Sequence, residues 1–257
     1  MNYKNKLYQF NTDCVNVPDN LHNSVNITNH KNQVVYFGNA DNYILKKDFY
    51  SFLLSVDEID RMRKFVFDDD RLTYCISHGC LRICLSEFTN IPNEELKIEY
   101  HSNKKPHLIN SNIDFNLSHS KNYFAFAVAD KTGTSIGVDI EKLNNLKDYK
   151  SIIQGYMNDD EKAYILDNFL SNHEQLVRFY EIWTRKEAFL KMLGAGISIN
   201  LSDINVVPGK KTITVVIPQN INVINFETYI YTKSTSDFVL SVSTNLNSTP
   251  DFIESNF

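Results

Sequence analysis

The stretch from residue 171 to residue 194 constrains this fold most, because its local signals all indicate one long helix. Ser171 and Glu174 have the spacing of a capping box, in which each side chain bonds the backbone of the other residue. No Pro or Gly interrupts the residues that follow, and Gly194 supplies the left-handed conformation that commonly ends a helix. The sequence therefore predicts a helix with both ends defined.

One face of this helix combines an aromatic residue, an acid and a base. At about 3.6 residues per turn, Trp183, Glu187 and Lys191 lie one above another. A Glu and a Lys four residues apart are most often a solvated ion pair worth about 0.2–0.5 kcal/mol. The only Trp of the chain shares their face, and two polar motifs upstream need a carboxylate and a cation. We therefore interpret this face as functional.

Length, charge and hydropathy exclude several classes of protein. The chain has 257 residues, 42% of them hydrophobic, which suffices for one large core or two modest ones. A net charge of −5 argues against general nucleic-acid binding, so local Lys and Arg residues must hold any anionic ligand. The Asn-rich first thirty residues lack the apolar run of a secretory signal, and no run reaches the roughly 18 apolar residues of a membrane span. We expect a cytoplasmic protein.

Helix and strand patterns alternate in both halves and predict an α+β fold. Capping-box residues Ser55 and Glu58 open one expected helix, and another runs from about residue 70 to 88. Strands are expected at residues 33–37, 96–100, 113–120, 123–129, 135–141, 212–217, 226–231 and 238–243. Those from 113 to 141 are predicted to form an antiparallel meander. We expect a polar arm (1–32) followed by two lobes (33–132 and 133–257), each with helices on a small antiparallel sheet.

A strand with two acids is a candidate metal site. The strand period of two puts Gly137, Asp139 and Glu141 on one face. Neighbouring carboxylates repel one another unless a cation lies between them, and oxygen ligands suit Mg²⁺. We expect Gly137 to leave room for a ligand. The alternative is a solvent-facing acidic pair, which a third carboxylate from elsewhere would make less plausible.

Two further polar groups leave several interpretations open. Ser118 and His119 end a predicted strand, where they could bind phosphate or form a polar turn without a role. A serine nucleophile is disfavoured, because the Gly-x-Ser-x-Gly elbow is missing and neighbouring side chains on a strand point apart. The three cysteines near His78 lack a Cys-x-x-Cys pair, so buried thiols fit them better than zinc. These cysteines are Cys75, Cys80 and Cys84.

Taken together, the motifs resemble those of the Sfp-type 4′-phosphopantetheinyl transferases. The matching stretches are Lys105–Pro106, Phe115–Ser120, Gly137–Glu141, Trp183–Lys191 and Gly194–Ile197, in the family's order and rough spacing. The resemblance extends over about residues 34–243 and departs at Lys104, where Gly is usual, and at Lys64, where Arg is usual. The N-terminal arm matches nothing in the family pattern.

The resemblance implies a fold, a reaction and partners. Two similar lobes would be related by a pseudo-twofold axis, with coenzyme A in the cleft between them. The monomeric enzyme would transfer phosphopantetheine from coenzyme A to a serine of an acyl or peptidyl carrier protein, with Mg²⁺, and release adenosine 3′,5′-bisphosphate. Fatty acid, polyketide and nonribosomal peptide synthesis all use such carriers. Carrier docking is expected near residues 143–164, although acidic residues at 159–161 argue against that surface.

The resemblance also implies roles for individual residues. Asp139, Glu141 and Glu187 would hold Mg²⁺, with Glu187 also the best candidate for the base that takes the serine proton. Lys191 would contact the phosphate under attack, and Lys186, about 100° round the helix, ranks below it. The remaining coenzyme A contacts would be Lys105 at the adenine end and Arg61, Arg71, Ser118 and His119 around the 3′-phosphate.

Three other functions remain open at this point. A coenzyme A or carrier-protein binding module without catalysis would need the cations but not the three carboxylates. A serine hydrolase would need a reactive Ser118. An inactive scaffold that only binds carrier proteins is the third possibility, and the complete set of motifs argues against it.

Overall fold

The structure is a computed structural model that describes residues 32–101, 105–130, 133–194, 199–209, 212–217 and 222–255. Almost all of the expected N-terminal arm, Lys104 and residues 195–198 lie outside these ranges. The fold is mixed α+β, with small sheets and helices. No helix within the described part of the chain is long and apolar enough to cross a membrane.

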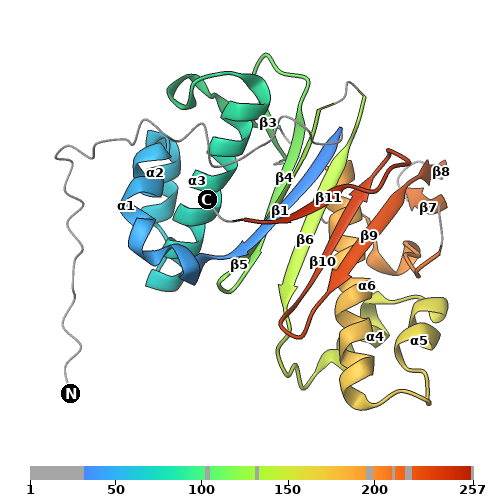
Figure 1. Cartoon of the computed structure of the whole chain (residues 1–257). Helices are drawn as coiled ribbons and strands as arrows, with labels where there is room; N and C mark the ends of the chain where they lie inside the picture. Colours follow the sequence, from blue (N-terminus) through green and yellow to red (C-terminus); the bar gives the residue numbers. More distant parts are fainter. Residues whose placement is uncertain are drawn as a thin grey trace, which may run out of the picture.

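The first sheet contains four strands in the order β11-β1-β5-β4. Their bounds are Asp251–Glu254 (β11), Gln33–Asn39 (β1), Tyr123–Ala129 (β5) and Asp114–Ser120 (β4). β5 is antiparallel to both of its neighbours, whereas β11, near the end of the chain, runs parallel to β1. Helices α1 (Lys47–Leu53), α2 (Val56–Arg63) and α3 (Asp68–Thr89) lie beside this sheet, together with η3 (Ala40–Lys46) (Figure 1). η4 (Asn93–Glu95) and the hairpin of β2 (Ile98–Tyr100) and β3 (Pro106–Leu108) lead into β4.

The second sheet is antiparallel, with the order β6-β10-β9. Its strands are Ile136–Lys142 (β6), Phe238–Thr244 (β10) and Tyr229–Ser234 (β9). Helix α6 (Asn172–Leu193) packs on β6 and β10, and α4 (Tyr149–Tyr156) and α5 (Asp159–Ile165) lie on the far side of α6 (Figure 1). The turn η6 (Leu201–Asp203) and the ribbon of β7 (Thr212–Ile217) and β8 (Asn222–Glu227) complete this half.

The two sheets face one another, so the helices form the outer layers. On β5, alternation sends Phe126 into the core with α3 and the small Ala127 into a second core against β6 and β10. This inter-sheet core is built from Val35, Phe37, Ala125, Ala127, Ala129, Ile136, Val138, Ile140, Phe238, Leu240 and Val242. A third core lies between α6 and the helices and loops outside it. The order of layers is therefore helices, sheet, sheet, helices.

The capping signals confirm the predicted helix ends. Ser171 and Glu174 form a complete capping box at the start of α6, and Gly194 ends the helix with φ of 65°. Ser55 and Glu58 form the same box at the start of α2. Local hydrogen bonds determine these ends, so the sequence predicts them well.

The predicted meander over residues 113–141 is wrong for its third strand. β4 and β5 form the expected hairpin, but β6 pairs with β10 in the other sheet. Side chains of β4 take the place of a strand partner for β6: Ile136 N–H donates to Asp114 Oδ2 (2.8 Å) and Val138 N–H to Asn116 Oδ1 (3.1 Å). The predicted strand at 226–231 is also divided, between β8 and β9.

Candidate active site at the junction of β4, β6 and α6

Alternate residues of β4 all reach toward β6. Because the strand period is two, Asp114, Asn116, Ser118 and Ser120 share one face. The first two bond the backbone of β6, and the last two bond its acidic side chains. This face of β4 therefore fixes both the position of β6 and the orientation of its carboxylates.

Asp139 is at the centre of this cluster. Its side chain is buried, and Oδ1 accepts hydrogen bonds from Ser118 Oγ (2.8 Å) and from Lys191 Nζ (2.7 Å). Lys191 Nζ also donates to Ser118 Oγ (2.8 Å). The structure thus brings together three residues that the sequence places on two strands and a helix. The buried carboxylate of Asp139 is paired with the ammonium group of Lys191.

Two further acids lie close enough to affect one another. Burial raises the pKa of Glu187, the charge of Asp139 raises it further, and Lys191 lowers it. Burial also raises the pKa of Glu141, whereas the hydrogen bond from Ser120 Oγ (2.5 Å) lowers it. The charges of Asp139 and Glu187 add to the increase for Glu141. A cation bound beside these carboxylates would offset the effect of the neighbouring negative charge on Glu141 and Glu187.

The donor set fits a magnesium ion. Asp139 Oδ2 is buried and has no hydrogen-bond partner within the described ranges, so one carboxylate oxygen remains available to a cation. The carboxylates of Asp139, Glu141 and Glu187 offer oxygen ligands, as Mg²⁺ prefers. No three His, Cys, Asp or Glu side chains of the described chain are arranged to hold a metal as they stand. Magnesium binding therefore stays a prediction, supported by the chemistry of the donors.

The expectation that Gly137 leaves room for a ligand is wrong. A Cβ atom at this position would overlap the backbone of α6, at the Ala188 carbonyl and the Met192 N–H. The missing side chain instead lets α6 pack directly on β6. This close approach sets how far Glu187 and Lys191 lie from Asp139.

A cavity of about 520 Å³ opens between the two halves, beside this cluster. Its polar lining includes His119, Glu187 and Lys191, and the rest is largely apolar. Apolar and aromatic lining residues are Phe65, Tyr74, Leu81, Ile98, Tyr100, Pro106, Phe115, Leu117, Leu190, Ile199 and Leu201. Such a cavity suits a ligand with both an aromatic part and anionic groups.

Ser118 and His119 lie on opposite faces of β4. Ser118 points to Asp139, whereas His119 lines the cavity. The His119 ring is reachable by solvent, yet desolvation by the surrounding protein lowers its pKa, and the charge of Lys191 lowers it further. Of these two neighbouring residues, only His119 lines the cavity.

The other predicted coenzyme A contacts are spread out. Arg61 donates to the hydroxyl of Tyr100, a cavity residue (2.6 Å), and lies 4.5 Å from the centre of its ring. Arg71 bonds the Phe65 and Val66 carbonyls and Asp68, none of which belongs to the acidic cluster. The site therefore gathers Asp139, Glu141, Glu187, Lys191, Ser118 and His119, but not Arg71.

Lys105 lines the cavity and also links the two halves. Its Nζ donates to Asp114 Oδ2 (2.6 Å) and to the Ile136 and Met192 carbonyls (3.2 Å each). The last of these carbonyls lies at the end of α6, where a cation complements the helix dipole. Sequence reasoning assigned Lys105 to a ligand and missed this structural role.

His78 is a cavity residue that the sequence did not single out for a ligand. Its ring stacks on Tyr74 with 3.7 Å between centres, and Nδ1 lies 3.0 Å from the Tyr74 carbonyl. Burial lowers the pKa of His78 to about 3, so the ring is neutral and Nδ1 is the donor. The nearby Cys75, Cys80 and Cys84 are buried and free, as expected. The helical period, which places His78 on a different face of α3 from Cys80 and Cys84, is the sequence signal that could have distinguished it.

Two family models match successive parts of the chain. Residues 46–131 match the 4′-phosphopantetheinyl transferase, N-terminal model. Residues 135–243 match the model of the 4′-phosphopantetheinyl transferase superfamily. The second match contains β6, α6 and β10, and the first contains α2, α3 and the β4–β5 hairpin.

Curated relatives that are named phosphopantetheinyl transferases are similar to this chain over part of their length. The 4′-phosphopantetheinyl transferase HetI of Nostoc sp. is 34% identical over 149 residues, which cover 56% of this chain and 61% of the relative. The transferase gsp of Aneurinibacillus migulanus is 27% identical, over 67% of this chain and 69% of the relative. The human L-aminoadipate-semialdehyde dehydrogenase-phosphopantetheinyl transferase is 26% identical, over 56% and 50%. The chain thus spans between half and about two thirds of these relatives.

Proposed function

We infer from the two family matches, over residues 46–131 and 135–243, that the chain belongs to the 4′-phosphopantetheinyl transferase superfamily. We propose that it transfers the 4′-phosphopantetheine group of coenzyme A to a serine of an acyl or peptidyl carrier protein. Adenosine 3′,5′-bisphosphate is the second product. The observation that supports this proposal best is the cluster of Asp139, Glu187 and Lys191 beside a cavity that holds both polar and aromatic groups.

The residues of the cluster match the demands of the reaction. The serine oxygen forms a bond to the β-phosphorus of coenzyme A, and the bond from that phosphorus to the bridging oxygen breaks. The electron pair stays on the departing phosphate, and the serine proton goes to a base. Protein groups contribute to such a step mainly by positioning and by stabilising charge. Lys191 is placed to stabilise charge, and Glu187 is placed to accept the proton.

Glu187 is suited to act as the base by its surroundings. Burial and the neighbouring Asp139 raise its pKa, and a carboxylate with a raised pKa is a stronger proton acceptor. Lys191, one turn further along α6, counteracts the increase and keeps the group ionisable. Lys186 points elsewhere, into a buried ion pair.

We propose that Asp139, Glu141 and Glu187 hold Mg²⁺. The available Asp139 Oδ2 supports this set, and so does the effect of the neighbouring negative charge on the pKa of Glu141 and of Glu187. When bound, the ion would neutralise charge on the pyrophosphate oxygens of coenzyme A. The chain's own task is to hold the carboxylates in place, through Ser118 and Ser120.

Coenzyme A itself is proposed to occupy the cavity. The aromatic part of the lining suits the adenine base of coenzyme A. His119 and Lys191 in the lining, and Arg61 beside Tyr100, suit the phosphates of coenzyme A. Lys105 lines the same cavity, which supports a place near the base. Ser118 and Arg71, the other two proposed phosphate contacts, are engaged with protein partners, so they have less support.

The finer description of the fold is also a proposal. Two lobes, residues 33–132 and 133–257, would be related by a pseudo-twofold axis with the active site in their cleft. A helix of 22 residues packed beside an antiparallel pair of strands in each half, α3 and α6, supports this view. β11 departs from the division, since it belongs to the second lobe in sequence but pairs with β1.

Monomeric state, location and docking surface complete the proposal. One chain supplies every residue of the site, which is consistent with a monomer. A cytoplasmic location follows from the proposed reaction, because coenzyme A and unmodified carrier proteins are made there. For carrier docking we propose residues 143–164, where Lys147 and Lys150 are exposed. Glu161 is buried, so it contributes less acidic surface there than the sequence implied.

The decisive experiment is intact-protein mass spectrometry of an apo carrier protein incubated with this protein, coenzyme A and Mg²⁺. The proposal predicts a gain equal to one phosphopantetheine group, abolished by a chelator and by Asp139→Ala. Lack of any gain on acyl and peptidyl carriers alike, with coenzyme A still bound, would favour a binding module without catalysis.

A further inference from the structure

A fully buried ion pair lies directly behind the candidate active site. Lys186 precedes Glu187 on α6, and its side chain is shielded from solvent, as is that of Glu161 on α5. Lys186 Nζ lies 2.8 Å from Glu161 Oε2. Burying two charges is costly, so the contacts that this pair makes must be accounted for.

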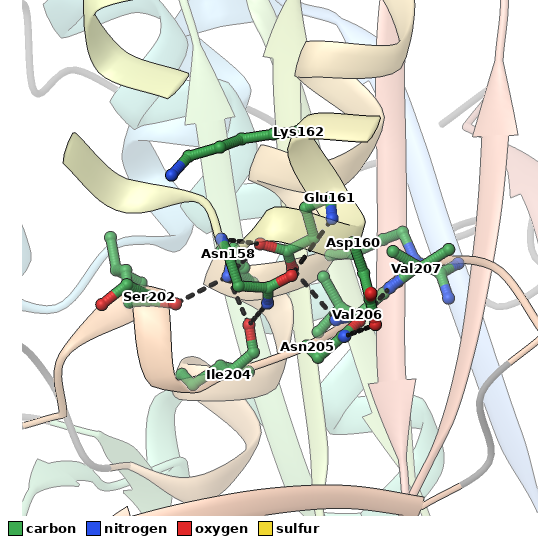
Figure 2. A network of polar contacts seen from close by, with 12 residues as sticks. Asn158, Asp160, Glu161, Lys162, Ser202, Ile204, Asn205, Val206 and Val207 are labelled. Atoms are coloured by element: carbon green, nitrogen blue, oxygen red, sulfur yellow. Dashed lines mark hydrogen bonds and ion pairs between the residues drawn. The ribbon is translucent and has the colours of Figure 1, made fainter. Parts of the chain in front are cut away.

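Each oxygen of Glu161 has a backbone partner as well. Oε1 accepts from Val206 N–H (3.1 Å), and Oε2 accepts from Asn158 N–H (3.1 Å). Figure 2 shows this carboxylate between the start of α5 and the extended segment that contains Val206. Asn158 adds a bond from Nδ2 to the Ile204 carbonyl (3.0 Å). Glu161 therefore ties α5 to residues 201–206.

Lys186 ties the same segment to α6. Besides Glu161, its Nζ donates to the Leu201 carbonyl (2.6 Å) and to the Ile204 carbonyl (2.5 Å). An ammonium group has three N–H donors, so all three are engaged. The segment is thus held at Leu201 and Ile204 by the helix and at Val206 by Glu161.

This segment forms part of the cavity wall. Ile199 and Leu201 line the cavity together with Glu187 and Leu190 of α6. The backbone oxygen of one wall residue, Leu201, is bonded to the residue next to Glu187. A shift of the ion pair would therefore move the wall relative to the proposed base.

We propose that Lys186 and Glu161 are a positioning pair, which holds residues 199–206 against α6 and so fixes the cavity wall opposite Glu187. Stability alone does not require such a pair, because a protein with well-packed apolar residues of similar volume in its place is often as stable or more stable. Apolar residues could not bond the Leu201 and Ile204 carbonyls or the Val206 N–H. The effect on coenzyme A binding rests on the proposed function. The tethering of residues 199–206 to α6 does not.

The test uses the double variant Glu161→Leu/Lys186→Met, which removes both charges and keeps similar volumes. Amide hydrogen exchange of residues 199–206 and the dissociation constant of coenzyme A are measured in the full chain, with the melting temperature as a check of folding. We expect a folded protein with exchange about tenfold faster in this segment, and coenzyme A bound about tenfold more weakly, or about 1.4 kcal/mol. In the transfer assay KM for coenzyme A should rise more than kcat falls.

The matched control is Asp60→Leu/Arg63→Met, which removes an exposed ion pair on α2 (3.4 Å) and should change neither measurement. Wild-type exchange and wild-type affinity in a folded double variant would overturn the proposal. If the double variant does not fold, Glu161→Gln, which preserves the side-chain volume, takes its place. Unchanged hydrogen exchange of residues 199–206 in Glu161→Gln would also overturn the proposal. Exchange is measured without ligand or carrier, so failure of the proposed transfer reaction would leave this test intact.

Discussion

Lys191 Nζ lies 2.7 Å from Asp139 Oδ1, and this contact joins the last turn of α6 to the middle of β6. Ser118 closes the triangle with hydrogen bonds to both groups. One cation thus balances a carboxylate that we propose as a metal ligand. Lys191 and a magnesium ion would therefore compete for the same negative charge.

Removing Lys191 should make the site more responsive to magnesium. In Lys191→Met, Asp139 loses its cation while its other oxygen still has no hydrogen-bond partner in the described structure. We expect Mg²⁺ to raise the melting temperature of this variant more than that of the wild type. Thermal denaturation over a series of magnesium concentrations measures the effect. Lys97→Met, at an exposed position, is the control, and equal magnesium responses in all three proteins would contradict the competition.

Replacing Glu187 should separate catalysis from ligand binding. Glu187→Gln preserves the shape of the side chain but removes the proton acceptor, so we expect transfer to fall by about 100-fold or more. Coenzyme A binding, measured by calorimetry without carrier, should stay within about threefold of wild type. Glu254→Gln, at the exposed end of β11, serves as control. A near-normal rate for Glu187→Gln would rule out its role as base.

Gly137 and Gly155 should respond in opposite ways to the same substitution. A methyl group at Gly137 would overlap the backbone of α6, and backbone cannot move aside cheaply, so Gly137→Ala should destabilise by about 3 kcal/mol or more. Gly155, an exposed residue of α4, has nothing near its added Cβ, so alanine there should stabilise by up to about 1 kcal/mol. Urea unfolding of both variants checks the pair. Equal effects would show that α6 does not pack on β6 as closely as described.

What the sequence predicted well depends on local geometry. The ends of α6 follow from Ser171, Glu174 and Gly194, whose bonds span only a few residues. The strand period placed Asp139 and Glu141 on one face of β6, which the contacts with Ser118 and Ser120 confirm. Such features need no knowledge of the rest of the chain.

What the sequence missed depends on long-range contacts. The pairing of β6 with β10, about a hundred residues away, cannot be read from β6, whose alternation fits either sheet. The same holds for β11, which pairs with the start of the described chain. Gly137 was assigned to a ligand because no local signal reveals that α6 lies against it. Lys186 and Glu161 form their pair only once α5 and α6 are packed.

Charge reversal on the second lobe tests the proposed carrier surface. Lys147 and Lys150 are exposed beside α4, and carrier domains of this type are acidic. We expect Lys147→Glu/Lys150→Glu to raise KM for the carrier about tenfold, while coenzyme A affinity is unchanged. The KM for the carrier is measured from steady-state transfer rates at several salt concentrations, because an electrostatic contact weakens as salt is added. An unchanged KM would remove residues 143–164 as the docking surface.

Glu87 should make the stability of the first half depend on pH. Burial on α3 raises the pKa of this carboxyl from 4.5 to about 7, so the folded protein binds its proton more tightly than the unfolded chain does. The stabilisation is complete below pH 4.5 and is lost as the pH rises toward about 7, where the folded protein must also ionise the group. Glu87→Gln cannot ionise, so its stability relative to wild type should increase between these pH values and stay constant above. Urea unfolding midpoints from pH 4 to pH 8 measure this difference, and a difference that does not vary with pH would show that Glu87 is not desolvated.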